Sequence, residues 1–135
     1  MILLDTHVWL WMVDDLPSLH STVRKPIAEA ADKRELFLSP ISMWEISLKA
    51  SRRKLDLGMP VRKWLHTAVE RSRVLLAPID VEVACECAAL PTDFHGDPAD
   101  RIIAATARAE GFTLVTHDKT LLQLAKRGYF RALAT

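Results

Sequence analysis

The sequence has few of the features that place a protein in a membrane or outside the cell. None of its apolar runs approaches the length of a membrane span. No basic stretch followed by an apolar one opens the chain, because Asp5 interrupts the apolar segment at residues 1–13 almost at once. We therefore expect a protein of the cytoplasm that has no membrane partner.

Cysteine is also scarce, since Cys85 and Cys87 are the two cysteines of the chain. Their C-x-C spacing falls inside an expected helix, where the two side chains point to different faces. This spacing differs from that of a metal knuckle or a redox C-x-x-C pair. We interpret both as reduced thiols in or near the core.

An excess of charge of either sign is missing as well. The chain has 18 Lys and Arg residues against 17 Asp and Glu residues, which leaves a net charge of +1. Bulk charge therefore neither favours nor excludes a nucleic-acid partner. Local basic clusters at residues 52–54, 62–63 and 71–73 could follow a phosphate backbone or form solvated faces.

The chain does contain short apolar runs that alternate with amphipathic segments. Runs at residues 2–4, 36–39, 74–77 and 113–116 predict buried strands, and residues 130–133 predict an edge strand. Helices are expected to begin near His7, at Ser21 or Thr22, at Ser42, at Val61, at Val81, at Pro98 and shortly before Leu121. Because repeats, low-complexity tracts and linkers are absent from the sequence, these elements predict a single α/β domain over residues 1–135. A mainly parallel sheet covered by helices on both faces is the economical architecture.

Two carboxylates, Asp97 and Asp100, stand at the start of the alanine-rich helix expected over residues 98–110. Asp97 precedes a proline and is typical of an N-cap. Asp100 shares a helix face with Ile103 and Ala107, so it leans over the buried side of the helix. We interpret Asp100 as a ligand in a site, and Asp97 as the cap and an outer-shell or alternative ligand.

Three further acids occupy comparable places. Asp5 directly follows the first strand, Asp118 follows the fourth after one residue, and Glu45 lies in the first turn of the helix after the second strand. Ligands of open α/β sheets bind beyond the carboxyl ends of the strands. Together with Asp100, these positions favour one acidic site.

Each of these acids also has a purely structural interpretation. Asp5 and Asp118 could cap helices, whereas Glu45 could complete a capping box with Ser42 or pair with Lys49. Several carboxylates meeting at one place would repel one another unless a cation held them together. An acidic cluster without a histidine or cysteine pattern favours Mg²⁺ or Mn²⁺ over zinc.

Histidines offer a metal-free alternative, a nuclease that uses general acid–base catalysis. His7, His95 and His117 fall near the expected acidic cluster, but we interpret them as surface residues or as residues that support the acids. The tryptophans are expected in the core or at an interface rather than stacked on bases. They are Trp9, Trp11, Trp44 and Trp64.

Four segments carry a family resemblance in their order and spacing: residues 3–6 (LLDT), 42–46 (SMWEI), 97–105 (DPADRIIAA) and 114–118 (LVTHD). They resemble the PIN domain over nearly the whole chain, and more narrowly the VapC-type toxin ribonucleases of bacterial toxin–antitoxin pairs. The resemblance implies a three-layer α/β/α sandwich with a central, mainly parallel sheet. It also implies that catalytic acids bind Mg²⁺ or Mn²⁺, namely Asp5, Glu45, Asp100 and Asp118.

The function implied by this resemblance is that of a metal-dependent endoribonuclease, which hydrolyses RNA phosphodiester bonds with a metal-activated water. Thr6, Ser42 and Thr116 are expected to support the acids, although Thr6 and Ser42 could equally be caps. The implied partners are RNA, a cognate antitoxin, a second copy in a homodimer, and operator DNA that is reached only through the antitoxin complex. The alternative is a non-catalytic module that binds protein or nucleic acid on the same scaffold.

Overall fold

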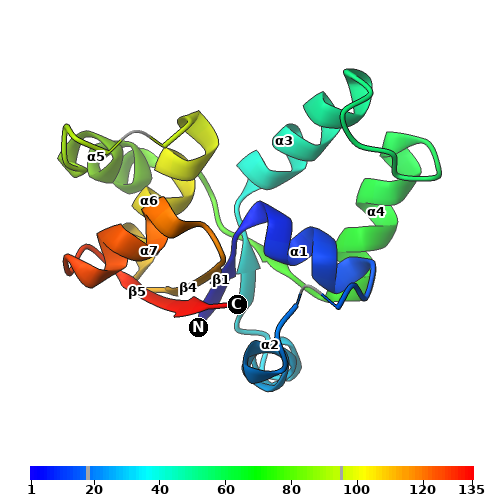
Figure 1. Cartoon of the computed structure of the whole chain (residues 1–135), viewed down its shortest axis with the longest axis horizontal. Coiled ribbons are helices and arrows are strands. Elements are labelled where there is room, and N and C mark those ends of the chain that lie inside the picture. Colours follow the sequence, from blue (N-terminus) through cyan, green and yellow to red (C-terminus); the bar gives the residue numbers. More distant parts are fainter. Residues whose placement is uncertain (18, 95) are drawn as a thin grey trace.

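A computed structural model describes residues 1–17, 19–94 and 96–135. In the described chain, one or two helices lie between each strand and the next (Figure 1). Their order is β1 (Ile2–Leu4), α1 (Thr6–Val13), α2 (Ser21–Asp32), β2 (Leu36–Leu38), α3 (Pro40–Ser51), α4 (Val61–Ser72), β3 (Leu75–Leu76), α5 (Val81–Ala89), α6 (Pro98–Glu110), β4 (Thr113–Thr116), α7 (Lys119–Lys126) and β5 (Arg131–Ala134).

The strands form one sheet in the order β3-β2-β1-β4-β5, and each of these neighbouring pairs is parallel. Ile2 of β1 lies opposite Leu36 of β2 and Thr113 of β4, so β1 occupies the centre. The carboxyl ends of β1, β2 and β4 therefore meet at one edge of the sheet, as the parallel arrangement predicted from the sequence requires. The last strand lies one residue further along the chain than predicted.

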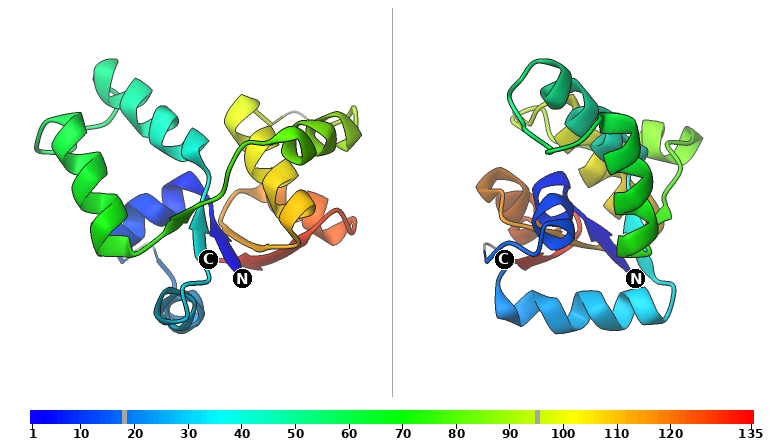
Figure 2. Two further views of the ribbon diagram at one scale, coloured as in Figure 1. Left: turned by 180° about the vertical axis from the view of Figure 1, so that it is seen from behind. Right: turned by 90° about the vertical axis from the view of Figure 1, so that its right-hand side faces the viewer.

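Helices cover both faces of the sheet, which confirms the three-layer sandwich. Helices α1, α3 and α4 lie on one side and α5, α6 and α7 on the other (Figure 2). Leu4 of β1 belongs to the first core with Val8 and Trp64, whereas Leu3 belongs to the second with Ile103. Alternate residues of one strand thus serve two cores. Burial of each leucine contributes about 1.5 to 3 kcal/mol to folding.

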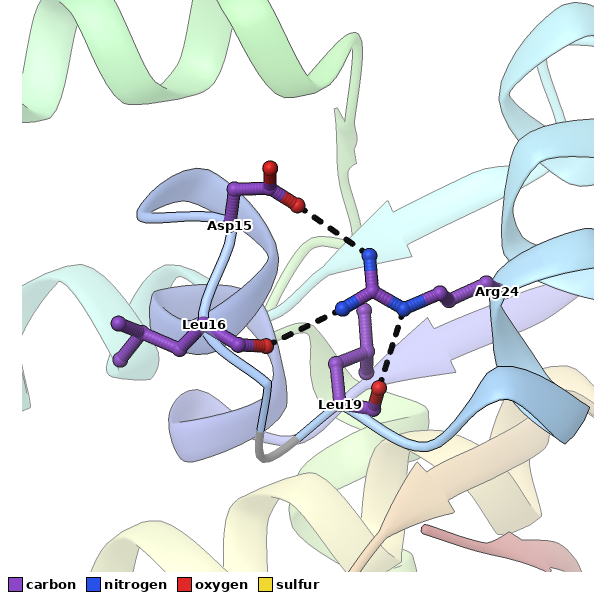
Figure 3. A network of polar contacts seen from close by, with 4 residues as sticks. All are labelled: Asp15, Leu16, Leu19 and Arg24. Carbon is purple, nitrogen blue, oxygen red and sulfur yellow. Dashed lines mark hydrogen bonds and ion pairs between the residues drawn. The ribbon is translucent and has the colours of Figure 1, made fainter.

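A single arginine ties the segment after α1 to helix α2 (Figure 3). The Nε of Arg24 donates to the carbonyl oxygen of Leu19 at 3.1 Å, and its Nη2 donates to that of Leu16 at 3.2 Å. Its Nη1 pairs with the Oδ1 of Asp15, also at 3.2 Å. The planar guanidinium, with five donors, suits this role because it reaches several acceptors at once.

Helix α3 begins earlier than the sequence predicted. Ser39 is its N-cap, and its hydroxyl accepts a hydrogen bond from the backbone N–H of Ile41 at 3.2 Å. Pro40 follows in the first turn, where its fixed φ is already helical and its missing N–H costs nothing. The predicted start at Ser42 is therefore wrong, and Ser42 lies buried within the helix. Helix α2 is likewise capped by His20, one residue before the predicted start.

The prediction of core thiols is wrong for Cys85, which is exposed on α5, whereas Cys87 is half-buried, and both are free. The reason is that α5 packs mainly against α6, and most residues of α5, including Cys85, are exposed. The tryptophans also differ from one another: Trp9 and Trp64 are buried, whereas Trp44 is 53% exposed. In the described part of the chain, no helix is both long and apolar enough to cross a membrane.

Candidate metal centre

Asp5 is the buried centre of the acidic site. It directly follows β1 and is the N-cap of α1, and its side chain is only 4% exposed. Its Oδ1 accepts a hydrogen bond from the backbone N–H of Thr6 at 2.7 Å, and its Oδ2 accepts one from the hydroxyl of Thr116 at 2.6 Å. Burial raises the pKa of Asp5, and this effect exceeds the lowering by the hydrogen bonds from Thr116 and Thr6.

The hydroxyl of Thr116 also links Asp5 to a second acid. While it donates to Asp5, its Oγ1 accepts a hydrogen bond from the backbone N–H of Asp118 at 3.0 Å. Asp118 is the N-cap of α7 and accepts with Oδ1 from the N–H of Leu121 at 2.9 Å. The predicted capping roles of Asp5 and Asp118 are therefore confirmed. Because β1 and β4 are neighbours, the same contacts hold the two carboxylates at one edge of the sheet.

A second pair of hydroxyls connects α1 with α3. The hydroxyl of Thr6 donates to the Oγ of Ser42 at 2.9 Å, and both side chains are buried. This contact fixes the first turn of α3, one turn before Glu45. The capping-box interpretation of Glu45 is wrong because Ser39, not Ser42, caps the helix. The ion pair is confirmed, with Lys49 Nζ lying 3.5 Å from Glu45 Oε2.

At the start of α6 the two aspartates have separate positions. Asp97 is exposed and caps the helix, accepting a hydrogen bond from the N–H of Asp100 at 2.8 Å. Asp100 is half-buried. Loss of solvation raises the pKa of Asp100 to about 7, with further contributions from the negative charges of Asp97, Asp5, Asp118 and Glu45. The fold thus brings all the predicted acids close enough to repel one another.

The donor set fits a hard divalent cation. Each carboxylate oxygen has two lone pairs, so Asp5 keeps acceptor capacity after its two hydrogen bonds. Carboxylate oxygens are ligands that Mg²⁺ and Mn²⁺ prefer. Across residues 1–17, 19–94 and 96–135, no three acid, histidine or cysteine side chains lie close enough together to hold one ion in common. The acids therefore repel one another through space without sharing an ion. Their carboxylates can move closer together only when their negative charge is neutralised.

Two of the three histidines named in the metal-free alternative lie beside this site. His7 and His117 are exposed, with ring centroids 5.9 Å apart, and Trp11 packs edge-on against His117 at 4.7 Å. Neither ring is hydrogen-bonded to a carboxylate in the part of the chain that the structure describes. His95 lies outside the described residues. The sequence does not predict this aromatic group, because its members come from α1 and the residues after β4.

The chain is similar to known proteins over most of its length. The PIN domain family matches residues 2–127. Ribonuclease VapC22 of Mycobacterium tuberculosis is 39% identical over 120 residues, which are 89% of this chain and 88% of that protein.

Two crystal structures are similar in fold. One is VapBC2 from Rickettsia felis bound to a DNA fragment from their promoter, with a TM-score of 0.73, 19% identity and coverage of 100% of this chain and 99% of the other. The second is DNA-bound VapBC from Salmonella typhimurium, with a TM-score of 0.70, 17% identity and coverage of 98% and 96%. At these identities the likeness shows the fold.

Proposed function

Because this chain belongs to the PIN domain family, we propose that it is a metal-dependent endoribonuclease and the toxin of a toxin–antitoxin pair, acting as one domain over residues 1–135. The observation that carries the proposal is the gathering of acids at the carboxyl edge of the parallel sheet, where Thr116 links Asp5 to Asp118 and where burial and neighbouring acids raise the pKa of Asp100. In a cluster without a cation, such mutual repulsion destabilises the folded protein. A bound cation removes the repulsion, so the same cluster is typical of a cation site. The similarity to a protein named ribonuclease VapC22 supports RNA as the substrate.

In this proposal the ligands of Mg²⁺ or Mn²⁺ are Asp5, Glu45, Asp100 and Asp118. Asp97 starts α6 and acts from the outer shell. When bound, the ion supplies a water of lowered pKa and stabilises negative charge on the phosphate that is hydrolysed.

The residues of the chain prepare the acids for this role. Thr116 and the N–H of Thr6 hold Asp5 in one orientation through two hydrogen bonds. Asp100 carries a proton about half of the time near pH 7, because its pKa is about 7. Its deprotonation accompanies ion binding, so we expect metal affinity to rise with pH. Lys49 partly neutralises Glu45 and limits the repulsion between the acids.

The partners also belong to the proposal. We infer an antitoxin whose segment covers the acidic site, a homodimer, and operator DNA that is bound only through the antitoxin complex. The two DNA-bound VapBC structures support the presence of an antitoxin and DNA, because they share the fold of this chain over nearly its whole length.

The first test replaces the two central acids. We expect Asp5→Asn and Asp100→Asn each to abolish Mn²⁺-dependent cleavage of cellular RNA, because each removes a charged ligand while asparagine keeps nearly the same shape. Glu29→Gln is the matched control, since it makes the same acid-to-amide change on the exposed surface of α2. Cleavage is measured on total RNA with the ends mapped by sequencing, and ion binding by calorimetry.

The outcomes separate the candidate functions. Full activity in both aspartate variants would contradict the proposal. Cleavage that survives a chelator but is lost in His7→Ala and His117→Ala would favour the metal-free route, because these two rings lie together beside Asp5. Wild-type protein that neither binds Mn²⁺ nor cuts RNA would favour the non-catalytic module.

A further inference from the structure

A hollow with a volume of about 210 Å³ opens beside the acidic site, between α3 and the start of α6. Its lining changes character along α3, from Trp44 and Glu45 in the first half of the helix to Arg52 and Lys54 beyond its end. The seven residue steps from Glu45 to Arg52 advance about 10 Å along the helix axis. An acidic end and a basic end therefore share one depression.

We propose that this hollow binds one nucleotide of single-stranded RNA next to the cleaved bond, with its base against Trp44 and its phosphate at Arg52 and Lys54. The inference rests on the proposed nuclease function, and it assigns residues outside the acidic cluster to the binding of substrate.

The first support is the exposure of Trp44. Its side chain is 53% exposed, whereas Trp9 and Trp64 are buried in the core and pack edge to face at 5.4 Å. An exposed indole keeps its ring face and its N–H available to a binding partner. Its face accepts any base by stacking, which suits a single strand whose bases are unpaired. The adjacent Leu48 adds an apolar wall to the same hollow.

The second support is the state of the cations. Arg52 and Lys54 are exposed, and within the described residues neither forms an ion pair, whereas Lys49 is already paired with Glu45. In the other basic clusters, Arg73 is paired with Asp32 at 3.0 Å, whereas Arg62 and Lys63 form no ion pair within the described residues but do not line the hollow. Uncommitted cations bind phosphate at a lower cost because no ion pair has to be broken. They also offset the repulsion between RNA and the nearby acids.

Size and charge together favour RNA over a protein segment. The hollow is smaller than the roughly 300 to 1,000 Å³ pockets of drug-sized ligands, so it suits one base. A protein segment bound in this hollow would need an apolar side chain to contact Trp44 and acidic side chains to pair with Arg52 and Lys54. Its acidic side chains would also be repelled by Glu45 and Asp97. In the proposed nucleotide the negative charge lies on the phosphate at Arg52 and Lys54, and the uncharged base lies at the end of the hollow that holds Trp44 and Glu45.

The experiment measures binding separately from cleavage. The Asp5→Asn variant, whose asparagine is also a good N-cap, is titrated with a fluorescent single-stranded RNA of mixed sequence at several salt concentrations. In this background we expect Trp44→Ala to raise the Kd at least about 5-fold, and Trp44→Phe to restore most of the affinity, because phenylalanine also stacks on bases. Cleavage by the same variants in the Asp5 wild-type background should show the change in KM rather than in kcat.

The cations are tested by the salt dependence. Removing Arg52 and Lys54 together, as alanines, should make the slope of log K against log salt shallower by about 0.7, since both contact the same phosphate and each neutralised phosphate on a single strand contributes about 0.7. The double change of Arg62 and Lys63 to alanine is the matched control, because these cations are exposed on α4 and do not line the hollow. We expect it to leave the slope unchanged.

Two results would overturn the proposal. The first is an unchanged Kd for RNA in Trp44→Ala, with correct folding checked by circular dichroism. This result would mean that the hollow does not bind a base and would favour a protein segment as its occupant. Equal slopes for the two double variants would show that phosphate does not sit at Arg52 and Lys54. Failure of the nuclease proposal looks different: wild-type protein would not cut RNA, whereas the loss of binding in Trp44→Ala would remain measurable.

Discussion

At the scale of single residues, the acids of this protein are defined by their neighbours rather than by their type. Asp97 and Asp100 lie three positions apart on one helix, yet Asp97 is exposed and stabilises the helix start, while Asp100 is half-buried with a raised pKa. The helical geometry of the sequence was sufficient to assign Asp97 as the cap. The role of Asp100 as a metal ligand stays a prediction.

This raised pKa leads to a prediction for Asp100→Asn in metal-free protein. The carboxyl has a pKa of about 7 when folded and an ordinary value when unfolded, so the unfolded chain loses its proton first as pH rises. The free energy of unfolding of the wild type therefore falls between about pH 4 and pH 7 and stays low above it. At pH 8 we expect the variant to be more stable by about 1 to 2 kcal/mol, a value reduced because solvent screens a half-exposed group.

The measurement is urea denaturation in chelator at pH 4.5 and pH 8. The difference in unfolding free energy between variant and wild type should be smaller at pH 4.5 than at pH 8. At pH 4.5 both folded proteins carry an uncharged group at position 100. Glu29→Gln, on the surface of α2, should show no such trend. A variant that is less stable than the wild type at pH 8 would mean that Asp100 serves the helix start and not an acidic cluster.

At the scale of elements, the site depends on how the strand ends are joined. Thr116 at the end of β4 binds Asp5 after β1 and the N–H of Asp118 before α7. Its exposed fraction is 0%, so this hydroxyl is a buried link between two element junctions. The sequence placed Thr116 among the supporting residues, but its two partners became visible only when β1 and β4 were paired.

We predict that Thr116→Val weakens both folding and metal binding. The variant leaves the N–H of Asp118 and an oxygen of Asp5 without their partner, which costs about 1 to 3 kcal/mol of unfolding free energy. We also expect metal affinity to fall about 10- to 100-fold, because an acid that loses its orienting hydrogen bond is a poorer ligand. Calorimetry with Mn²⁺ and urea denaturation measure the two effects.

Thr116→Ser should recover most of the metal affinity, because it keeps the hydroxyl. Thr113→Val is the matched control at the other end of β4, where the threonine is half-buried and far from the acids along the strand. Metal affinity that is unaffected by Thr116→Val would show that Asp5 does not need this contact to act as a ligand.

At the scale of the whole molecule, the two halves of the fold meet at the site. Asp5 and Glu45 come from the elements of the first core, and Asp100 and Asp118 come from those of the second. A cation held between them would join the two helical layers across the edge of the sheet. Binding to the folded state alone raises the free energy of unfolding with ligand concentration.

We therefore predict that Mn²⁺ raises the melting temperature. At a concentration 100 times the Kd, the ion adds about 2.7 kcal/mol to the free energy of unfolding, which corresponds to several degrees in Tm. Differential scanning calorimetry of wild type, Glu29→Gln and the double variant Asp5→Asn with Asp100→Asn measures it. The first two should shift with Mn²⁺ and the double variant should not. An equal shift in all three would place the ion elsewhere.

Several features of this protein follow from the sequence alone. Apolar runs located the strands, and the proline and aspartates at residues 97–100 located the start of α6. These signals are local, because burial in a sheet and the capping of a helix depend on residues within a few positions of each other. Local signals also predicted the capping role of Asp118. They failed at Ser42, since Ser39 with Pro40 makes a stronger helix start.

The tertiary structure decided what depends on distant neighbours. The closeness of Asp5 to Asp118 follows from the pairing of β1 with β4, and the exposure of Cys85 follows from how little of α5 is covered. Solvation and charge repulsion depend on every group nearby in space, so the raised pKa of Asp100 appears only when parallel strands bring the acids to one edge of the sheet.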